Sequence, residues 1–223
     1  VDLPEGASLA ARWDPHGPGA VAAAVSAVAA AVPAGTWLYW GFNAEFLFFP
    51  FCESRRVGEM LAFHAEERRA AMLCYTVDLF AADLTAHPGG VDRGSAHLDA
   101  AGYFAEARPD PATGHPKERQ LDIFGGLRRR YEEHVAPARR RIDRIALLRT
   151  APGLRLRDDF TTTDEERNTY ACPWHHNLTA AVCSFRAAKA LRANPGSRAA
   201  IASFLWPGAV PFGWQSGQLM DLG

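Results

Sequence analysis

Residues 37–51 read Trp-Leu-Tyr-Trp-Gly-Phe-Asn-Ala-Glu-Phe-Leu-Phe-Phe-Pro-Phe and hold the clearest fold signal in the chain. Large apolar side chains fill residues 37–40 and again 46–51, which predicts two strands because aromatic residues favour sheets. Residues 41–45 lie between them and predict a turn. The polar side chains of this turn, Asn43 and Glu45, are therefore expected at the end of a strand.

Helical and strand patterns alternate outward from this stretch. Valines recur at helical spacing in residues 20–32, and residues 57–64 predict a shorter helix. The continuous apolar run 70–77 predicts a fully buried strand, and residues 145–149 predict another. We therefore expect an α/β fold with a mixed, mostly parallel sheet that is flanked by helices.

The second half of the chain is less regular. Residues 81–120 are rich in Pro, Gly, Asp and His and predict a long loop, and residues 152–174 predict an irregular segment. A basic stretch at 128–141 is expected to be helical. Residues 179–192 and 197–205 predict two further helices, with Ser197 as the N-cap of the last.

The domain organisation that follows from this pattern is simple. Residues 1–19 are rich in Pro and Gly and are expected to form an N-terminal loop. Residues 20–205 predict a single α/β domain, because 223 residues suffice for one domain of ordinary size. Residues 206–223 predict a C-terminal tail that lies across the surface.

Composition limits the classes of partner and compartment. With 48% hydrophobic and 22% charged residues the chain is globular, and its formal net charge of −1 provides no field that recruits nucleic acid. The four cysteines form no Cys-x-x-Cys pair, so we expect reduced thiols and a cytoplasmic protein. No signal peptide is expected, and the longest apolar run, residues 20–32, is too short for a transmembrane segment.

Several blocks, in order, resemble bacterial glycosyltransferase family 2, in the branch whose acidic motif reads Asp-Ala-Asp-Glu-Phe-Leu. The resemblance spans roughly residues 37–191. The blocks are Glu45-Phe46-Leu47-x-x-Pro50, the buried strand at 72–80 with Asp78, residues 97–104, Phe124-Gly125-Gly126-Leu127-Arg128-Arg129-Arg130, and the strand at 144–149.

The resemblance implies a GT-A-like fold and a function. A protein of this family transfers a sugar from a nucleotide-diphosphate donor to the hydroxyl of a saccharide or other acceptor, with Mg²⁺ or Mn²⁺ at the acidic motif. Here Phe42 and Ala44 stand where the two aspartates would be, and Ser184 stands where the family often has a histidine. These departures weaken the implied cation site and raise the alternative of a non-catalytic binding or scaffold subunit with a protein partner.

Glu45 and Asn43 are the candidate metal ligands. Mg²⁺ and Mn²⁺ prefer oxygen ligands, and the Glu45 carboxylate and the Asn43 carbonyl can supply two. The competing interpretation is structural, with Glu45 capping a turn or pairing with an arginine.

Arginines and histidines are the candidate ligands of the donor phosphates. Gly125-Gly126 permits close backbone approach, and the guanidinium forks of Arg128 and Arg130 match phosphate oxygens. His175 and His176 are candidate phosphate or hydroxyl partners. With Cys172 one of them has zinc-ligand spacing, which gives a third hypothesis, a metal-dependent hydrolase.

Two aspartates are the best-placed candidates for a catalytic base. Asp78 follows a predicted strand and Asp99 precedes Gly102, so either carboxylate can lie at a cleft and accept a proton from an acceptor hydroxyl. The competing interpretation for each is a structural ion pair or cap.

Overall fold

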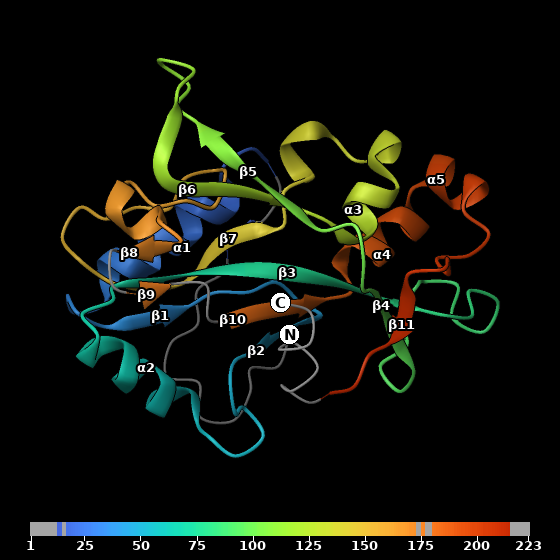
Figure 1. Cartoon of the computed structure of the whole chain (residues 1–223), viewed down its shortest axis with the longest axis horizontal. Helices are drawn as coiled ribbons and strands as arrows, with labels where there is room; N and C mark the ends of the chain where they lie inside the picture. The colour runs from blue at the N-terminus through green and yellow to red at the C-terminus, as the bar shows by residue number, and fades with distance from the viewer. Residues whose placement is uncertain (1–12, 15–16, 173–174, 177–179, 215–223) are drawn as a thin grey trace.

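The computed structural model describes residues 13–14, 17–172, 175–176 and 180–214, without the side chains of 171, 172, 175 and 176 (Figure 1). Its centre is a sheet with α2 (Val57–Glu66) on one side and α1 (Ala20–Ala31), α3 (Gly126–Arg130) and α4 (Arg186–Ala193) on the other. None of the helices in the described part of the chain is both long and apolar enough to cross a membrane.

The central sheet is mixed but mostly antiparallel. Its seven strands among the described residues run in the order β1 (Trp37–Tyr39), β7 (Asp143–Arg149), β3 (Ala71–Ala81), β10 (Ala180–Ser184) and β2 (Glu45–Phe48), while β4 (Ala96–Asp99) pairs with β3 and β11 (Ala209–Pro211) with β4. Only the β3–β10 pair among these is parallel.

The predicted α/β class is confirmed, but the predicted mostly parallel, GT-A-like sheet is not. The parallel prediction depended on the apolar run at 70–77, which does form part of β3. Such a run shows that a strand is covered on both faces, and it leaves strand direction open. In this protein α2 covers one face and the other helices cover the opposite face of an antiparallel sheet (Figure 1).

The predicted helix at 179–192 is wrong in its first half. Residues Ala180–Ser184 form β10, and helix α4 begins at Arg186. The run Ala-Ala-Val-Cys-Ser fits a short buried strand as well as a helix, and periodicity cannot separate the two. Every residue of β10 is buried between β2 and β3, so tertiary packing decides its state.

The predicted loop at 81–120 contains sheet structure. Besides β4, residues Phe104–Pro109 and Pro116–Phe124 form β5 and β6, an antiparallel hairpin that projects from the body (Figure 1). Five of the six residues of β5 are exposed and its buried residue is Arg108, so the strand lacks the apolar alternation that would reveal it in the sequence. The buried Arg108 forms an ion pair with Asp122 within the hairpin at 2.7 Å and another with Asp143 of β7 at 2.6 Å, and the second pair fastens the hairpin to the central sheet.

Several shorter segments also differ from the sequence pattern. The basic stretch at 128–141 is broken after α3 into two short 3₁₀ turns, η1 (Glu132–His134) and η2 (Pro137–Arg139). Helix α5 is Pro195–Ala200, and its N-cap is Asn194. Part of the predicted C-terminal tail forms β11 in the sheet, and the segment 152–174 contains η3 (Glu165–Asn168) and β8 (Ala171–Cys172), which pairs with β9 (His175–His176).

The core beneath α3, α4 and α5 is centred on Phe80. This ring is fully buried and makes aromatic contacts with Phe204 at 5.7 Å and Trp206 at 5.3 Å between ring centroids. Leu127 of α3 and Leu191 of α4 belong to the same cluster. Phe80 therefore joins the sheet to the helices that form one wall of the cavity described below.

Phe80→Ala is expected to lower the free energy of unfolding by about 3–5 kcal/mol, because it removes a large buried side chain and leaves a cavity. Denaturant titration measures the change. Phe63→Ala is the control, since Phe63 is 55% exposed and its loss is expected to cost less than about 0.5 kcal/mol. An equal loss in both variants would contradict this description of the core.

Candidate functional site: an arginine-lined cavity

A cavity of about 920 Å³ opens between α1, the segment 134–144, the start of β7 and α4. Its apolar surface comes from side chains such as Val21, Phe42 and Phe160. Proteins usually bind small molecules and cofactors in cavities of roughly 300–1,000 Å³ with apolar walls and a few convergent polar groups. This cavity therefore has the size of a ligand site.

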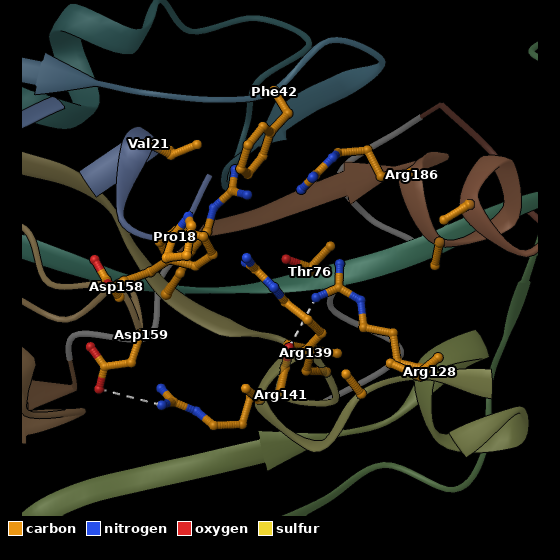
Figure 2. A pocket seen from close by; sticks show the side chains of 18 of the residues that line it. Pro18, Val21, Phe42, Thr76, Arg128, Arg139, Arg141, Asp158, Asp159 and Arg186 are labelled. Atoms are coloured by element: carbon orange, nitrogen blue, oxygen red, sulfur yellow. Dashed lines mark hydrogen bonds and ion pairs between the residues drawn. The ribbon is translucent and has the colours of Figure 1, made fainter. Parts of the chain in front are cut away.

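Arginines supply most of the charge on the cavity wall. Figure 2 shows several of them converging from different elements, one from α3, one from η2 and one from the start of α4. Among the described residues the arginines that line the cavity are Arg128, Arg139, Arg141, Arg144 and Arg186. The aspartates that line it are Asp143, Asp158 and Asp159.

A buried ion pair between Glu45 and Arg144 lies behind the cavity wall. Arg144 Nη1 and Nη2 donate to Glu45 Oε1 and Oε2 at 3.2 and 2.7 Å, and the Glu45 side chain is fully buried. The Phe42 amide donates to Oε2 at 2.8 Å and Ser184 Oγ donates to Oε1 at 3.2 Å. Burial alone would raise the pKa of Glu45, but Arg144 and the Phe42 amide together hold it below its ordinary value.

The Phe42 ring lies near two guanidinium groups at the cavity wall. The Arg186 guanidinium lies over the Phe42 ring at 3.3 Å from its centroid, and that of Arg144 lies 5.6 Å away. Arg186 Nη1 is also 3.8 Å from Glu45 Oε1, so one carboxylate serves two arginines. Burial lowers the pKa of Arg186, and the positive charges of Arg128, Arg144 and Arg139 oppose the attraction of Glu45.

Arg128 pairs with Asp78, which is one of the two candidate catalytic bases. Arg128 Nε is 3.3 Å from Oδ1, and its backbone amide donates to Oδ2 at 3.4 Å. Asp78 is fully buried, and burial raises the pKa of its carboxyl despite the opposing charge of Arg128. Gly126 has φ +61° and approaches so closely that a Cβ there would lie 3.0 Å from Oδ2. Asp78 thus positions the start of α3, and it does not line the cavity.

Arg130 pairs with Asp99, the other candidate base. Its Nε donates to Asp99 Oδ2 at 3.0 Å, and its guanidinium lies 5.0 Å from the centroid of the Trp206 ring. Asp99 is buried and also accepts a hydrogen bond from the Ala101 amide. Neither Arg130 nor Asp99 lines the cavity. The candidate bases and the candidate phosphate-binding arginines therefore pair with each other.

The remaining candidate ligands receive little support. The Glu45 carboxylate oxygens already accept hydrogen bonds from an arginine, a serine and a backbone amide, and the Asn43 side chain is exposed. These two residues therefore fit a divalent cation poorly. In the described part of the chain, no three His, Cys, Asp or Glu side chains gather closely enough to hold a metal ion. The side chains of His175 and His176 lie outside the described residues, so their predicted roles and the Mg²⁺ or Mn²⁺ cofactor stay predictions.

Of the cavity arginines, the sequence pattern singles out Arg128 alone. Arg139 and Arg141 lie in a basic stretch that looks like a solvated helix face, and Arg144 and Arg186 each lie next to an apolar run. A weak signal is present in the composition, since nearly all basic residues are arginine, the side chain suited to planar anion recognition. That these arginines converge on one cavity from four different elements can be seen only in the tertiary structure.

Comparisons of the chain with protein-family models, with curated proteins and with solved structures find no match. The geometry of the cavity is therefore the basis for a functional interpretation.

Glu45→Gln is expected to destabilise the protein by about 3–5 kcal/mol near neutral pH, because it leaves the buried Arg144 guanidinium without its counter-charge. The folded-state pKa of Glu45 is lowered, so this stabilisation is present above the ordinary value of 4.5 and is lost as the pH falls through the folded-state pKa. Chemical denaturation of wild type and variant between pH 7 and 3 measures the difference.

Glu118→Gln is the control for this prediction. The Glu118 side chain is 83% exposed and lies on β6, away from the cavity. Its loss is expected to leave stability nearly unchanged at every pH. A Glu45 effect that grows on acidification would contradict the role of the Glu45–Arg144 ion pair.

Proposed function

We propose that the protein binds a small phosphorylated molecule in the arginine-lined cavity. The observation that carries this proposal is the surplus of positive charge at one end. Arg139 has a distant aromatic contact, 6.0 Å from the Phe160 ring centroid, and no carboxylate partner among the described residues. Arg186 shares Glu45 with Arg144 at a distance of 3.8 Å.

The charge balance at this end can be counted from the described ion pairs. The guanidinium groups of Arg128, Arg139, Arg144 and Arg186 are accompanied by the carboxylates of Glu45 and Asp78. Four positive groups thus meet two negative groups, and two positive charges lack a counter-charge within this set. An anionic ligand would supply that charge, and partial burial strengthens the attraction.

Phosphate suits this arrangement better than a single carboxylate. A guanidinium presents its N–H donors in a planar fork that matches phosphate oxygens, and a phosphate has enough acceptors to engage several arginines together. The Phe42 ring holds Arg186 in place, which reduces the side-chain entropy that binding would cost. The volume of about 920 Å³ leaves room for a larger organic part beside the phosphate.

Transfer of a sugar from a nucleotide-diphosphate donor to an acceptor hydroxyl remains a narrower proposal within this one. Its support is that Arg128, which the family resemblance nominates, lines a cavity of sufficient size for such a donor. The alternative of a non-catalytic binding subunit uses the same anion site. Release of nucleoside diphosphate from a panel of nucleotide sugars, with and without Mn²⁺, separates the two.

Arg139→Gln and Arg186→Gln are each expected to weaken the binding of inorganic pyrophosphate roughly ten- to hundredfold, because a hydrogen bond to a charged group contributes about 1.5–3 kcal/mol. Isothermal titration calorimetry at low and high salt measures this, and the wild-type affinity is expected to fall as salt rises.

Arg55→Gln is the matched control. Arg55 is exposed, precedes α2 in the chain and forms an ion pair with Glu59 of that helix. It lies outside the cavity lining. This variant should bind pyrophosphate like the wild type. No binding to the wild type, or equal weakening in all three variants, would refute the proposed anion site.

A further inference from the structure

The cavity has a second, acidic end. Figure 2 shows Asp158 and Asp159 on the side where Pro18 and Val21 lie, across the cavity from Arg128 and Arg186. The two carboxylates come from one loop between β7 and η3, whereas the arginines opposite come from separate elements. The walls of one cavity thus carry opposite charge at opposite ends.

Arginines near the acidic end do not neutralise it. Arg141 makes its short ion pair with Asp143 and a further one with Asp122 at 3.1 Å, and it reaches Asp159 only at 3.7 Å. Arg108 likewise forms its ion pairs with Asp122 and Asp143. Two guanidinium groups therefore serve three carboxylates, those of Asp122, Asp143 and Asp159.

Asp158 adds a further negative charge. None of the described residues forms an ion pair with it, and its carboxylate faces the backbone that leads into α1. Gly19 has φ +73°, and a Cβ at this position would lie 3.0 Å from Asp158 Oδ1. The close approach of a glycine leaves the carboxylate beside bare backbone, without a covering side chain. Counted over the described residues, the acidic end thus has two negative charges in excess, equal to the positive excess counted in the same way at the arginine end.

From this separation of charge we propose that the ligand is zwitterionic, with a phosphate at the arginine end and a positively charged amine at the Asp158 end. The proposal rests on the proposed function, because it names the class of phosphorylated molecule that the same cavity takes. A uniformly anionic ligand would be attracted by the arginines at one end of the cavity and repelled by the carboxylates at the other. An ammonium group would be attracted at the acidic end and would donate hydrogen bonds to carboxylate oxygens that lack arginine partners.

Matched pairs of ω-aminoalkyl and ω-hydroxyalkyl phosphates, from ethyl to hexyl, test this directly by calorimetry. The two members of a pair have nearly the same size and differ in the charge of the terminal group. At the length that spans the cavity, the amine is expected to bind about three- to fivefold more tightly, the upper part of the range of a solvent-exposed ion pair. Asp158→Asn should abolish this preference while the affinity for the hydroxyalkyl phosphate stays within about twofold.

Asp83→Asn is the control, because Asp83 lies in a loop outside the cavity lining and its variant should keep the amine preference. Equal affinity for both members at every length, or a preference that survives Asp158→Asn, overturns the zwitterion proposal. If the hydroxyalkyl phosphates still bind and Arg186→Gln still lowers their affinity, the proposed anion site is supported although the zwitterion proposal fails. Absence of binding by every phosphate in the series overturns both proposals together.

Discussion

The buried ion pair between Glu45 and Arg144 is the interaction on which the site depends. It joins the first residue of β2 to β7, two strands that are not neighbours in the sheet, through two hydrogen bonds. Removal of two charges from water is costly, so such a pair persists where further hydrogen bonds satisfy it, as the Phe42 amide and Ser184 do here. The same contacts fix Phe42, and Phe42 fixes Arg186. One buried carboxylate thereby sets the positions of two guanidinium groups at the cavity wall.

The sequence predicts the local elements of the first half well and the topology poorly. The helix at 20–32 and the two strands on either side of the predicted 41–45 turn correspond to α1, β1 and β2, because each has a strong apolar pattern or a clear breaker. Strand direction is a property of pairing partners that lie far apart in the chain, so an apolar run cannot report it. The short run at 180–184 becomes a strand because two neighbours enclose it, and the charged hairpin β5–β6 is held by the buried Arg108.

The sequence predicts only single residues of the candidate site and not how they are arranged. The structural alternative for Glu45, an arginine partner, is what the structure shows, and the neighbouring Phe42 is the surface on which Arg186 lies. Asp78 and Asp99, the candidate bases, are buried, and each forms an ion pair with an arginine of one basic stretch, Arg128 and Arg130 respectively. Sequence reasoning can nominate charged residues near glycines, but which charges neutralise one another depends on side-chain geometry that only the folded chain defines.

The convergence of arginines from α3, η2, β7 and α4 also has a cost for the empty protein. Like charges that are far apart in the unfolded chain are brought together by folding, so their repulsion opposes the native state whenever the cavity lacks an anion. A molecule that binds only the folded form then acts as a stabiliser in proportion to its concentration. If the cavity binds an anion as proposed, substitutions that relieve the repulsion would raise thermal stability and weaken binding together. The melting temperature of the purified protein in different buffers would then report which anions bind.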